Sequence, residues 1–551
     1  MSTIEDIQVL VIGAGINGAG LFRDLCAQGV VCAIVDKADF GSGTSAAPSR
    51  LIHGGIKYLE TGELGLVAQS TKERNLLLKN APHAVSALPT VIPIFSWLNG
   101  IPAAIRTLFG STTAPRSRGA VLIKIGLLLY DFYGSRHRVM PRHSMWSRST
   151  ALANIPPLTR QIVAAGLYYD AKIVHPERLV LELVEDGISA EPRSFALNYA
   201  EIENSDGETV TLRDAHGVVR RVRPRIVVNA AGPWIDKVNA RLGVPSRLIG
   251  GTKGSHVLLD HPDLSRALAG RMIYFEANDG RICLVFDYHG RVLVGSTDIR
   301  ASDPDAIACE DDEIDYFLGS LRSLLPGLAF ERNQIVYAYS GIRPLPLSDG
   351  TAPGLISRDH SAPVIEASEG RQWPIFSLVG GKWTTFRGFA EEVADTLLER
   401  LDHPRRVRTD SLQIGGGRDY PAAAEQGRWL DATSRATATD PARALQLLHR
   451  YGSKAGDILM SEGRNPVFLD ETSCHSEQEI TWIVRNEHVI HLDDVVMRRT
   501  GLAVTGRLSL ATLFRISEIA AAELGWSEIK RDEELSRVRE ILSKRHRIRW
   551  A

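Results

Sequence analysis

The chain has 551 residues, which is too long for one compact core, and its 44% hydrophobic and 23% charged content is that of ordinary folded domains. We therefore expect two or three domains. A net charge of −1 predicts no nucleic-acid partner. The five cysteines are scattered, odd in number and never spaced as CxxC, which indicates a reducing compartment and argues against disulfides and a metal site.

The first residues resemble neither a signal peptide nor an Arg-rich transit peptide, because Glu5 and Asp6 lead directly into an apolar run. No run in the sequence reaches the roughly 18 apolar residues that a membrane span requires. We therefore expect a cytoplasmic protein that does not cross the bilayer as a helix.

The N-terminal residues have the pattern of a nucleotide-binding βαβ unit. The apolar run Ile7–Ile12 leads into the glycine-rich turn Gly13–Gly20, which is followed by the helical pattern Leu21–Cys26. A second apolar run, Val30–Val35, ends at Asp36. A strand, a glycine turn, a helix and a strand in this order predict a Rossmann-type domain.

Each glycine of this turn has a predicted role. Gly13 permits the tight turn, Gly15 lets the backbone approach a pyrophosphate, and Gly18 lets the helix pack on the strand. The helix N-terminus then faces the phosphates with unpaired N–H groups. Asp36 lies 18 residues past Gly18 and can accept hydrogen bonds from ribose hydroxyls. This unit alone does not separate FAD from NAD.

Two further segments favour FAD. The segment Gly41–Leu59 is dense in glycine and small hydroxyls, which suits a chain wrapped around an anchored cofactor. The segment Val379–Arg387 places two glycines before Lys382, Thr384 and Thr385. N–H groups, a helix end and a cation at one place suit the side of a flavin where negative charge appears on reduction.

A basic and apolar stretch follows the first domain. Between Arg74 and Tyr169 the only acid is Asp131, against eleven Lys or Arg. Apolar or aromatic residues lie among them, and those expected at the surface are Trp97, Leu98, Leu108, Phe109 and Leu127–Leu129. Cations interleaved with apolar groups predict contact with an anionic bilayer surface. The alternative is a basic lobe with its own core.

The remaining elements suggest a β-rich middle and a helical end. Residues 281–295 form the pattern of an antiparallel hairpin, and Arg225–Val228 that of a buried strand. Beyond Asp402 the spacing is helical, and His403-Pro404 with Gly415–Gly417 marks a linker. We predict an FAD-binding domain at residues 1–90, 160–240 and 340–402, a substrate and membrane-facing domain at 91–159 and 241–339, and a helical domain at 403–551.

Six motifs follow one another along the chain: Leu51–Glu60, Asn229–Trp234, Lys253–His256, Gly295–Asp298, Tyr339–Leu345 and Gly380–Thr385. In this order they resemble the FAD-dependent glycerol-3-phosphate dehydrogenases, within the D-amino-acid-oxidase-like fold. Residues 479–501 resemble that family's helical domain, so the resemblance covers nearly the whole chain. It implies an α/β fold with a Rossmann-type FAD-binding domain, an antiparallel substrate domain, a C-terminal helical domain and a quinone acceptor.

The resemblance also implies roles for single residues. His53 would take the hydroxyl proton of sn-glycerol 3-phosphate as hydride leaves carbon for flavin N5, with Arg343 and Lys382 as the other catalytic residues. Expected substrate-binding residues are Lys57, Tyr58, Arg358 (to the phosphate) and Thr384. Expected FAD-binding residues are Gly13, Gly15, Asn17, Gly18, Asp36, Lys37, Thr44, Ser45, Ser49, Leu51, Gly54, Gly55, Ala231, Gly232, Trp234, Gly341, Gly381 and Thr385.

The identity of the substrate stays open because the chain departs from the family pattern. Lys57 stands where the family usually has arginine, and Trp383 replaces a smaller apolar residue close to the expected substrate. The alternatives are oxidation of another small phosphorylated or carboxylated alcohol or amine, with quinone or oxygen as acceptor, and a flavin-binding scaffold or sensor without turnover. For the other partners we expect peripheral attachment to the inner face of the cell membrane, with a homodimer as one alternative.

Overall fold

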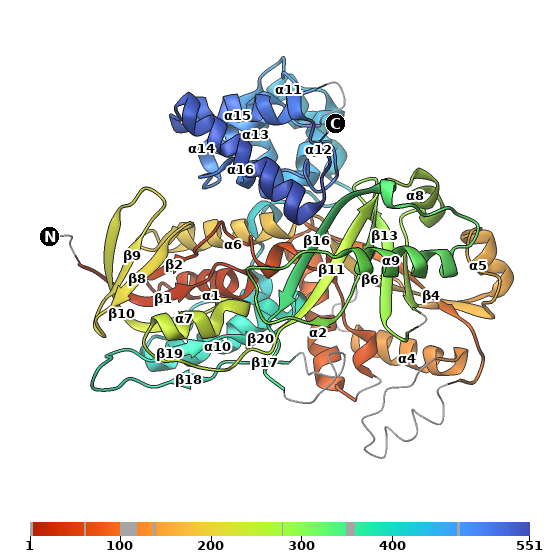
Figure 1. Cartoon of the computed structure of the whole chain (residues 1–551), viewed down its shortest axis with the longest axis horizontal. Coiled ribbons are helices and arrows are strands. Elements are labelled where there is room, and N and C mark those ends of the chain that lie inside the picture. The colour runs from red at the N-terminus through yellow and green to blue at the C-terminus, as the bar shows by residue number, and fades with distance from the viewer. Residues whose placement is uncertain are drawn as a thin grey trace.

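The computed structural model describes residues 4–59, 62–99, 118–135, 139–277, 279–348, 359–470 and 474–550. It contains two sheet-based parts side by side and a group of C-terminal helices above them (Figure 1). This arrangement is the predicted α/β architecture.

The first sheet is the nucleotide-binding sheet, and it has eight strands. At its centre β1 (Ile4–Ile12) pairs in parallel with β10 (Val219–Asn229) on one side and β2 (Cys32–Val35) on the other. Helix α1 (Ile16–Ala27) connects β1 to β2, which confirms the predicted βαβ unit. The outer strands are β7 (Phe195–Leu197), β8 (Glu201–Ser205), β9 (Val210–Arg213), β18 (Val364–Ile365) and β19 (Ile375–Ser377).

Helices on one face of this sheet close its core. Helix α1 packs against α6 (Pro176–Ala190) and α10 (Phe386–Arg400), and the aromatic rings of Phe22, Phe386 and Phe389 lie in the shared core. Gly20 allows this packing, because a Cβ there would lie 2.7 Å from the Phe386 ring. The N-terminus of α1 is thereby held at the end of β1.

The second sheet has ten mostly antiparallel strands. The predicted hairpin is confirmed as β13 (Ile282–Tyr288) and β14 (Arg291–Gly295). The other strands are β3 (Leu51–Ile52), β4 (Val85–Ile94), β5 (Ser144–Ser147), β6 (Ala164–Ile173), β11 (Thr252–Leu259), β12 (Met272–Glu276), β15 (Ile299–Arg300) and β16 (Ile335–Arg343). The helices beside this sheet are α2 (Leu64–Asn80), α4 (Ala120–Tyr133), α5 (Arg148–Asn154), α8 (Pro262–Leu268) and α9 (Asp311–Leu324).

Three strands lie in a different sheet from the one that the sequence boundaries give them. Strands β3 and β6 and the first six residues of β4 fall within the residues assigned to the FAD-binding domain, but they belong to the second sheet. The reason lies in two strand pairings. β4 pairs with β6 in antiparallel fashion over ten residues, and β4 also pairs in parallel with β12, which is followed in the sheet by β13 and β14. The two sheets are therefore connected through the segment that follows β2.

The C-terminal residues form the predicted helical domain. Its helices are α11 (Gln426–Thr437), α12 (Pro441–Tyr451), α13 (Ala455–Glu462), α14 (Glu477–Asn486), α15 (Leu510–Leu524) and α16 (Glu528–His546), with a π-helical turn η10 at Asp494–Arg499. The expected linker Gly415–Gly417 is tightly packed: a Cβ at Gly416 would overlap the Tyr451 carbonyl oxygen, and one at Gly417 the Asn80 carbonyl oxygen.

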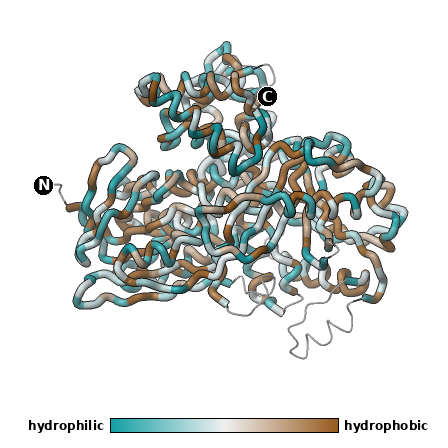
Figure 2. Tube along the Cα trace, in the orientation of Figure 1, coloured by the Kyte–Doolittle hydropathy of each residue, from teal (hydrophilic) through white to brown (hydrophobic). Residues whose placement is uncertain are grey.

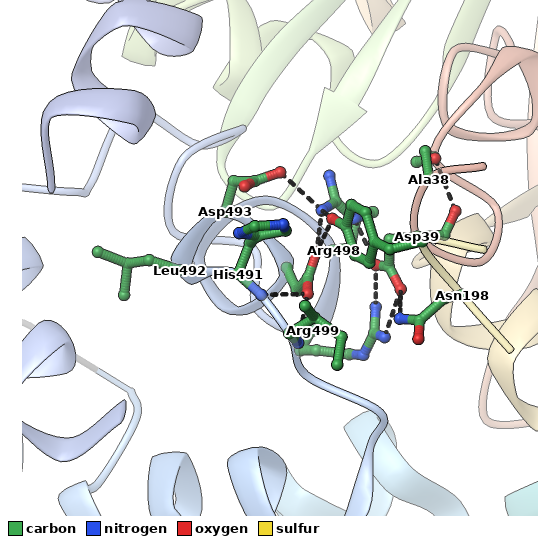
Figure 3. Close-up of polar contacts among 12 residues, drawn as sticks. Ala38, Asp39, Asn198, His491, Leu492, Asp493, Arg498 and Arg499 are labelled. Atoms are coloured by element: carbon green, nitrogen blue, oxygen red, sulfur yellow. Dashed lines mark hydrogen bonds and ion pairs between the residues drawn. The ribbon is translucent and has the colours of Figure 1, made fainter. Parts of the chain in front are cut away.

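Buried ion pairs join this domain to the nucleotide-binding sheet (Figure 3). Asp39 accepts hydrogen bonds from Arg498 Nε at 2.5 Å and from Arg499 Nη1 at 2.7 Å, and Asn198 donates to its other oxygen at 3.1 Å. Burial alone would raise the pKa of Asp39, but Arg499 and Arg498 reverse the effect and hold it well below its usual range. These ion pairs therefore hold the helical domain against the loop that begins at Asp36.

Among the described residues, no helix combines the length and the apolar content that crossing a bilayer needs.

Candidate active site

The glycine-rich turn has the geometry that nucleotide binding requires. Gly13 has φ +104°, and a Cβ there would lie 2.6 Å from the Ala230 carbonyl oxygen. A Cβ at Gly18 would overlap the Gly13 carbonyl oxygen. Gly15 is the N-cap of α1 and offers no capping side chain, so the first turn of the helix is open to an anion.

The groups around this turn fit FAD. Asp36 accepts hydrogen bonds from Ala14 N at 2.7 Å and Ala38 N at 3.0 Å, which leaves lone pairs of the carboxylate for ribose hydroxyls. Ser45 Oγ accepts from Ile16 N at 2.9 Å. The side-chain oxygen of Asn17 is buried and has no hydrogen-bond partner among the described residues, as expected of an atom that a bound group would contact.

Trp234 and Lys37 lie together beside Asp36. The Lys37 ammonium is 4.4 Å from the centroid of the Trp234 ring, and both side chains donate to Asp305, at 3.0 and 2.8 Å. Gly232, at the start of the same turn as Trp234, has φ +55°, whereas Ala231 before it has φ −73°. The loop after β15 therefore closes over this side of the nucleotide-binding turn.

The segment that follows β2 runs along strand β16. Thr44 Oγ1 donates to the Ile342 carbonyl at 2.7 Å, and a Cβ at Gly341 would lie 2.7 Å from Ala47. Ser49 Oγ bonds to His256 Nε2 at 2.9 Å, and Leu51 is buried as the first residue of β3. The wrapped segment predicted from its glycines and hydroxyls thus lies between the two sheets.

The backbone N–H groups of His53 and Gly54 both donate hydrogen bonds to side-chain oxygens. His53 N donates to Thr384 Oγ1 at 3.1 Å, and Thr384 is buried. Gly54 N donates to Tyr130 Oη at 2.8 Å. Gly55 has φ +75°, and a Cβ there would overlap the Tyr58 ring. The half-buried side chains of Lys57 and Tyr58 follow on the short helix at Ile56–Leu59.

Lys382 meets this segment from the other side. Its ammonium lies 3.7 Å from the centroid of the Tyr58 ring and donates to Ser70 Oγ at 3.1 Å. It follows strand β20 (Val379–Gly380) and Gly381, whose φ of +87° requires glycine. Thr385 begins helix α10 as its N-cap residue. The predicted residues His53, Tyr58, Lys382 and Thr384 are therefore together.

Arg343 approaches from the second sheet. Its guanidinium donates to Asp298 Oδ1 at 3.1 Å, to Ser296 Oγ at 3.2 Å and to the Thr297 carbonyl at 3.2 Å. The absence of a side chain at Gly254 makes room for it, because a Cβ there would overlap Arg343 Nη2. Its neighbour Pro344 accepts from Gly380 N at 3.0 Å, which ties the end of β16 to the Lys382 turn.

Two residues have surroundings that bear on the sequence interpretation. His256 is buried, its ring stacks on Tyr339 at 4.9 Å, and burial followed by the charges of Arg343 and Arg50 lowers its pKa well below the usual range. Its ring is therefore neutral near pH 7. Trp383 Nε1 donates to the Ser45 carbonyl at 3.2 Å, so this indole faces the nucleotide-binding core.

Arg358 lies outside the described residues, and its phosphate contact stays a prediction. The sequence interpretation did not single out the polar side chains on the inner face of α2 and α4, namely Ser70, Arg74 and Tyr130, or Asp170 on β6. One signal was present: α2 buries Ser70, Thr71, Glu73, Arg74 and Asn75, a polar run that an ordinary core helix does not contain.

Comparison with known proteins decides the family. Residues 8–396 match the family described as FAD dependent oxidoreductase, and residues 407–531 match the C-terminal domain of alpha-glycerophosphate oxidase. The chain is 32% identical to a glycerol-3-phosphate dehydrogenase of Synechocystis, over 97% of this chain and 96% of that protein. The chain belongs to the FAD-dependent glycerol-3-phosphate dehydrogenase family.

Other members of the family agree with this assignment. An aerobic glycerol-3-phosphate dehydrogenase of Staphylococcus epidermidis is 28% identical, over 90% of this chain and 87% of that protein. The solved structure of a glycerol-3-phosphate dehydrogenase from Bacillus halodurans, complexed with FAD, shares the fold with a TM-score of 0.72 and 22% identity, over 98% of this chain and 95% of that one. FAD is the cofactor of this family member, as predicted.

Proposed function

We propose that this chain oxidises sn-glycerol 3-phosphate to dihydroxyacetone phosphate. The observation that carries the proposal is the meeting of the His53–Tyr58 segment with Lys382 and Thr384, next to the nucleotide-binding turn. The names of the relatives point to the same substrate. Binding a phosphate dianion requires several cations. Lys57, Arg343 and Lys382 are candidates, because the Lys382 turn contacts the Ile56–Leu59 helix through Tyr58 and the end of β16 through Pro344.

The proposed mechanism assigns a task to each of these residues. His53 takes the proton of the substrate hydroxyl, since the near-neutral pKa range of an imidazole suits a general base. Arg343 and Lys382 stabilise the negative charge that develops on that oxygen. Thr384 fixes the main chain of His53 through the bond to its N–H. FAD, when bound, supplies the acceptor for the hydride that leaves the substrate carbon.

The test is the anaerobic flavin spectrum. Glycerol 3-phosphate should bleach the yellow holoenzyme, whereas glycerol, which lacks the phosphate, should do so far less well. Small carboxylated alcohols and amines form the comparison panel. Bleaching by a member of that panel but not by glycerol 3-phosphate would assign the other substrate class, and no bleaching by any of them would leave a non-catalytic flavoprotein.

The acceptor in this proposal is a membrane quinone, reached by docking on the inner face of the cell membrane. Supporting it is an apolar face around α4, formed by exposed side chains on the helix and on the adjoining residues 97–98. The hydropathy colouring in Figure 2 shows that α4 consists largely of apolar residues. The two parts adjoin because Val121 N donates to the Trp97 carbonyl at 3.3 Å. This apolar face consists of Trp97, Leu98, Val121, Ile125, Leu128, Leu129 and Phe132, which are 41–69% exposed.

Leu108 and Phe109, which are also expected on this surface, lie outside the described residues. Two other expected residues are buried. Leu127 is fully buried, because it continues the inner stripe of α4 with Ile123 and Tyr130. Arg74 is buried in an ion pair with Asp170 at 2.9 Å and so adds no surface charge. Lys124 is exposed and remains available to an anionic surface. Quinone and oxygen are distinguished by measuring oxygen uptake against reduction of a quinone analogue.

A further inference from the structure

A buried hydrogen-bond cluster lies directly behind the His53–Gly54 peptide. Tyr130 Oη on α4 donates to Asp170 Oδ1 at 2.5 Å and accepts from Gly54 N at 2.8 Å. Arg74 Nη1 on α2 donates to the same two oxygens, at 2.9 Å each. Gly54 N also lies 3.2 Å from Asp170 Oδ1. Three elements distant in sequence thus converge on one backbone amide.

The side chains of the cluster are shielded from solvent, which strengthens the hydrogen bonds between them. Arg74, Tyr130 and Asp170 are all at least 95% buried. Burial, and then the Asp170 carboxylate, raises the pKa of Tyr130 well above its usual value, so the phenol keeps its proton. It donates that proton to the carboxylate, and its oxygen is left to accept from Gly54 and Arg74. Low-dielectric surroundings strengthen each of these bonds.

The main chain at Gly54 is in close contact with this cluster. A Cβ at Gly54 would overlap Thr71 and lie 2.5 Å from Tyr130 Oη, so no side chain fits there. The preceding residue, His53, is bonded through its own N–H to Thr384. The peptide between these two amides is therefore fixed from both sides, by the short turn Trp383–Thr385 that precedes α10 and by α4.

We propose that Tyr130 is a positioning residue for the reaction, which sets the orientation of the His53–Gly54 peptide and thereby the position of the His53 ring. This inference rests on the proposed function, because it gives His53 the role of base. Tyr130 acts through Gly54, while Asp170 and Arg74 fix the direction of its hydroxyl. Nothing in the role depends on contact of Tyr130 with the substrate.

The test is Tyr130→Phe, which keeps the ring and its edge-to-face contact with Tyr168 at 5.6 Å but removes the hydroxyl. The matched control is Tyr133→Phe, which removes a hydroxyl from the half-buried end of the same helix. In anaerobic rapid mixing with glycerol 3-phosphate, Tyr130→Phe should lower the limiting rate of flavin reduction about 10-fold, since 1.4 kcal/mol corresponds to a factor of ten.

The substrate concentration for half-maximal reduction should stay within about twofold of wild type in Tyr130→Phe, because no phosphate-binding group is touched. The acid limb of the pH profile should also shift, since the surroundings of the His53 ring change. The control should match wild type in all three measurements. FAD content and melting temperature are followed in parallel, and a lower melting temperature with unchanged reduction rate and pH profile would mean that Tyr130 only stabilises the core.

The failure of this inference is distinguishable from the failure of the proposed function. If glycerol 3-phosphate does not reduce the wild-type flavin, the proposed function is wrong and the inference falls with it. If it reduces wild type and Tyr130→Phe equally fast with the same pH profile, only the positioning role is wrong.

Discussion

A single carboxylate, Asp36, should make flavin binding depend on pH. Burial raises its pKa to about 6, against the hydrogen bonds from Ala38 and Ala14 that lower it. Ribose hydroxyls donate to the ionised carboxylate, so FAD binds the deprotonated form better. Below about pH 6 the affinity of the apoprotein for FAD should therefore fall by up to tenfold per pH unit. Titrations of the apoprotein from pH 5 to pH 8 measure this.

The same group affects the stability of the FAD-free chain with the opposite sign. The pKa of Asp36 in the folded chain, about 6, is raised above the unfolded value of about 3.9, so between about pH 3.9 and 6 the folded chain binds more protons than the unfolded chain. The stability that the protonated Asp36 contributes is therefore fully present below about pH 3.9 and is lost as the pH rises through about 6. In Asp36→Asn both pH dependences should disappear. A flat affinity profile in the wild-type apoprotein would contradict the ribose role of Asp36.

The base role of His53 predicts a large loss of rate with the cofactor retained. General acid–base groups contribute about 10²–10⁴-fold, so His53→Asn should slow anaerobic flavin reduction by that order and abolish the acid limb of its pH profile. The control is His216→Asn at an exposed position. If His53→Asn keeps both rate and acid limb, His53 is not the base, and His256 becomes the first candidate for that role.

The sequence predicted site residues that lie in short local motifs, but it did not predict those that meet only when distant elements pack together. His53, Lys382 and Thr384 belong to short motifs through which the sequence resembles the family, and the resemblance implies their roles. Tyr130 and Asp170 are 40 residues apart and meet only through the packing of α4 on β6. In the sequence Tyr130 is one more aromatic residue in a basic and apolar stretch, and nothing local indicates that its hydroxyl faces Gly54.

Among the elements, local patterns were read correctly and long-range pairing was not. The βαβ unit, the hairpin β13–β14 and the C-terminal helices follow from periodicity and turn residues. Strands β4 and β6 have apolar runs that would suit either sheet. Their pairing with each other across 69 intervening residues, and the pairing of β4 with β12, place them in the second sheet. A sequence contains no local signal for such a contact.

The packed turn Gly415–Gly417 gives a prediction for an element. Gly416→Ala should place a methyl group on the Tyr451 carbonyl oxygen and destabilise the joint between the helical domain and the rest by about 1–3 kcal/mol. The control is Gly427→Ala in α11, where a Cβ meets no atom within 4 Å and should stabilise by about 0.5–1 kcal/mol. Thermal melting and limited proteolysis measure both. Equal melting temperatures of Gly416→Ala and wild type would show that the turn accommodates the methyl group without loss of stability.

At the scale of the whole molecule, helix α4 and the C-terminal helical domain lie on opposite sides (Figure 1). The ion pairs of Asp39 hold the helical domain on the nucleotide-binding sheet. Breaking such a buried pair by removing one partner costs about 3–5 kcal/mol, so the domain would stay in place if the protein docked on a membrane. A protein attached through α4 would therefore hold its helical domain away from the bilayer.

Docking through α4 predicts how the protein partitions onto vesicles. Each Lys or Arg close to an anionic surface contributes about 1 kcal/mol, a contribution that salt screens. Inserted apolar side chains add a contribution that salt does not weaken. In liposome flotation the protein should therefore bind anionic vesicles more strongly than neutral ones, and high salt should loosen the binding without abolishing it.

Substitutions on the outer face of α4 make this prediction specific. Ile125→Asp combined with Leu128→Asp should release the protein from anionic vesicles, because both side chains are half-exposed and neither belongs to the buried stripe of α4. Reduction of a soluble dye by glycerol 3-phosphate should be unchanged in this double variant. The matched control is Val218→Asp, an equally exposed apolar residue in the turn between β9 and β10, which should float like wild type. A double variant that floats like wild type would place the membrane contact elsewhere, and wild-type protein that stays at the bottom of the gradient at low salt would exclude docking on anionic lipid altogether.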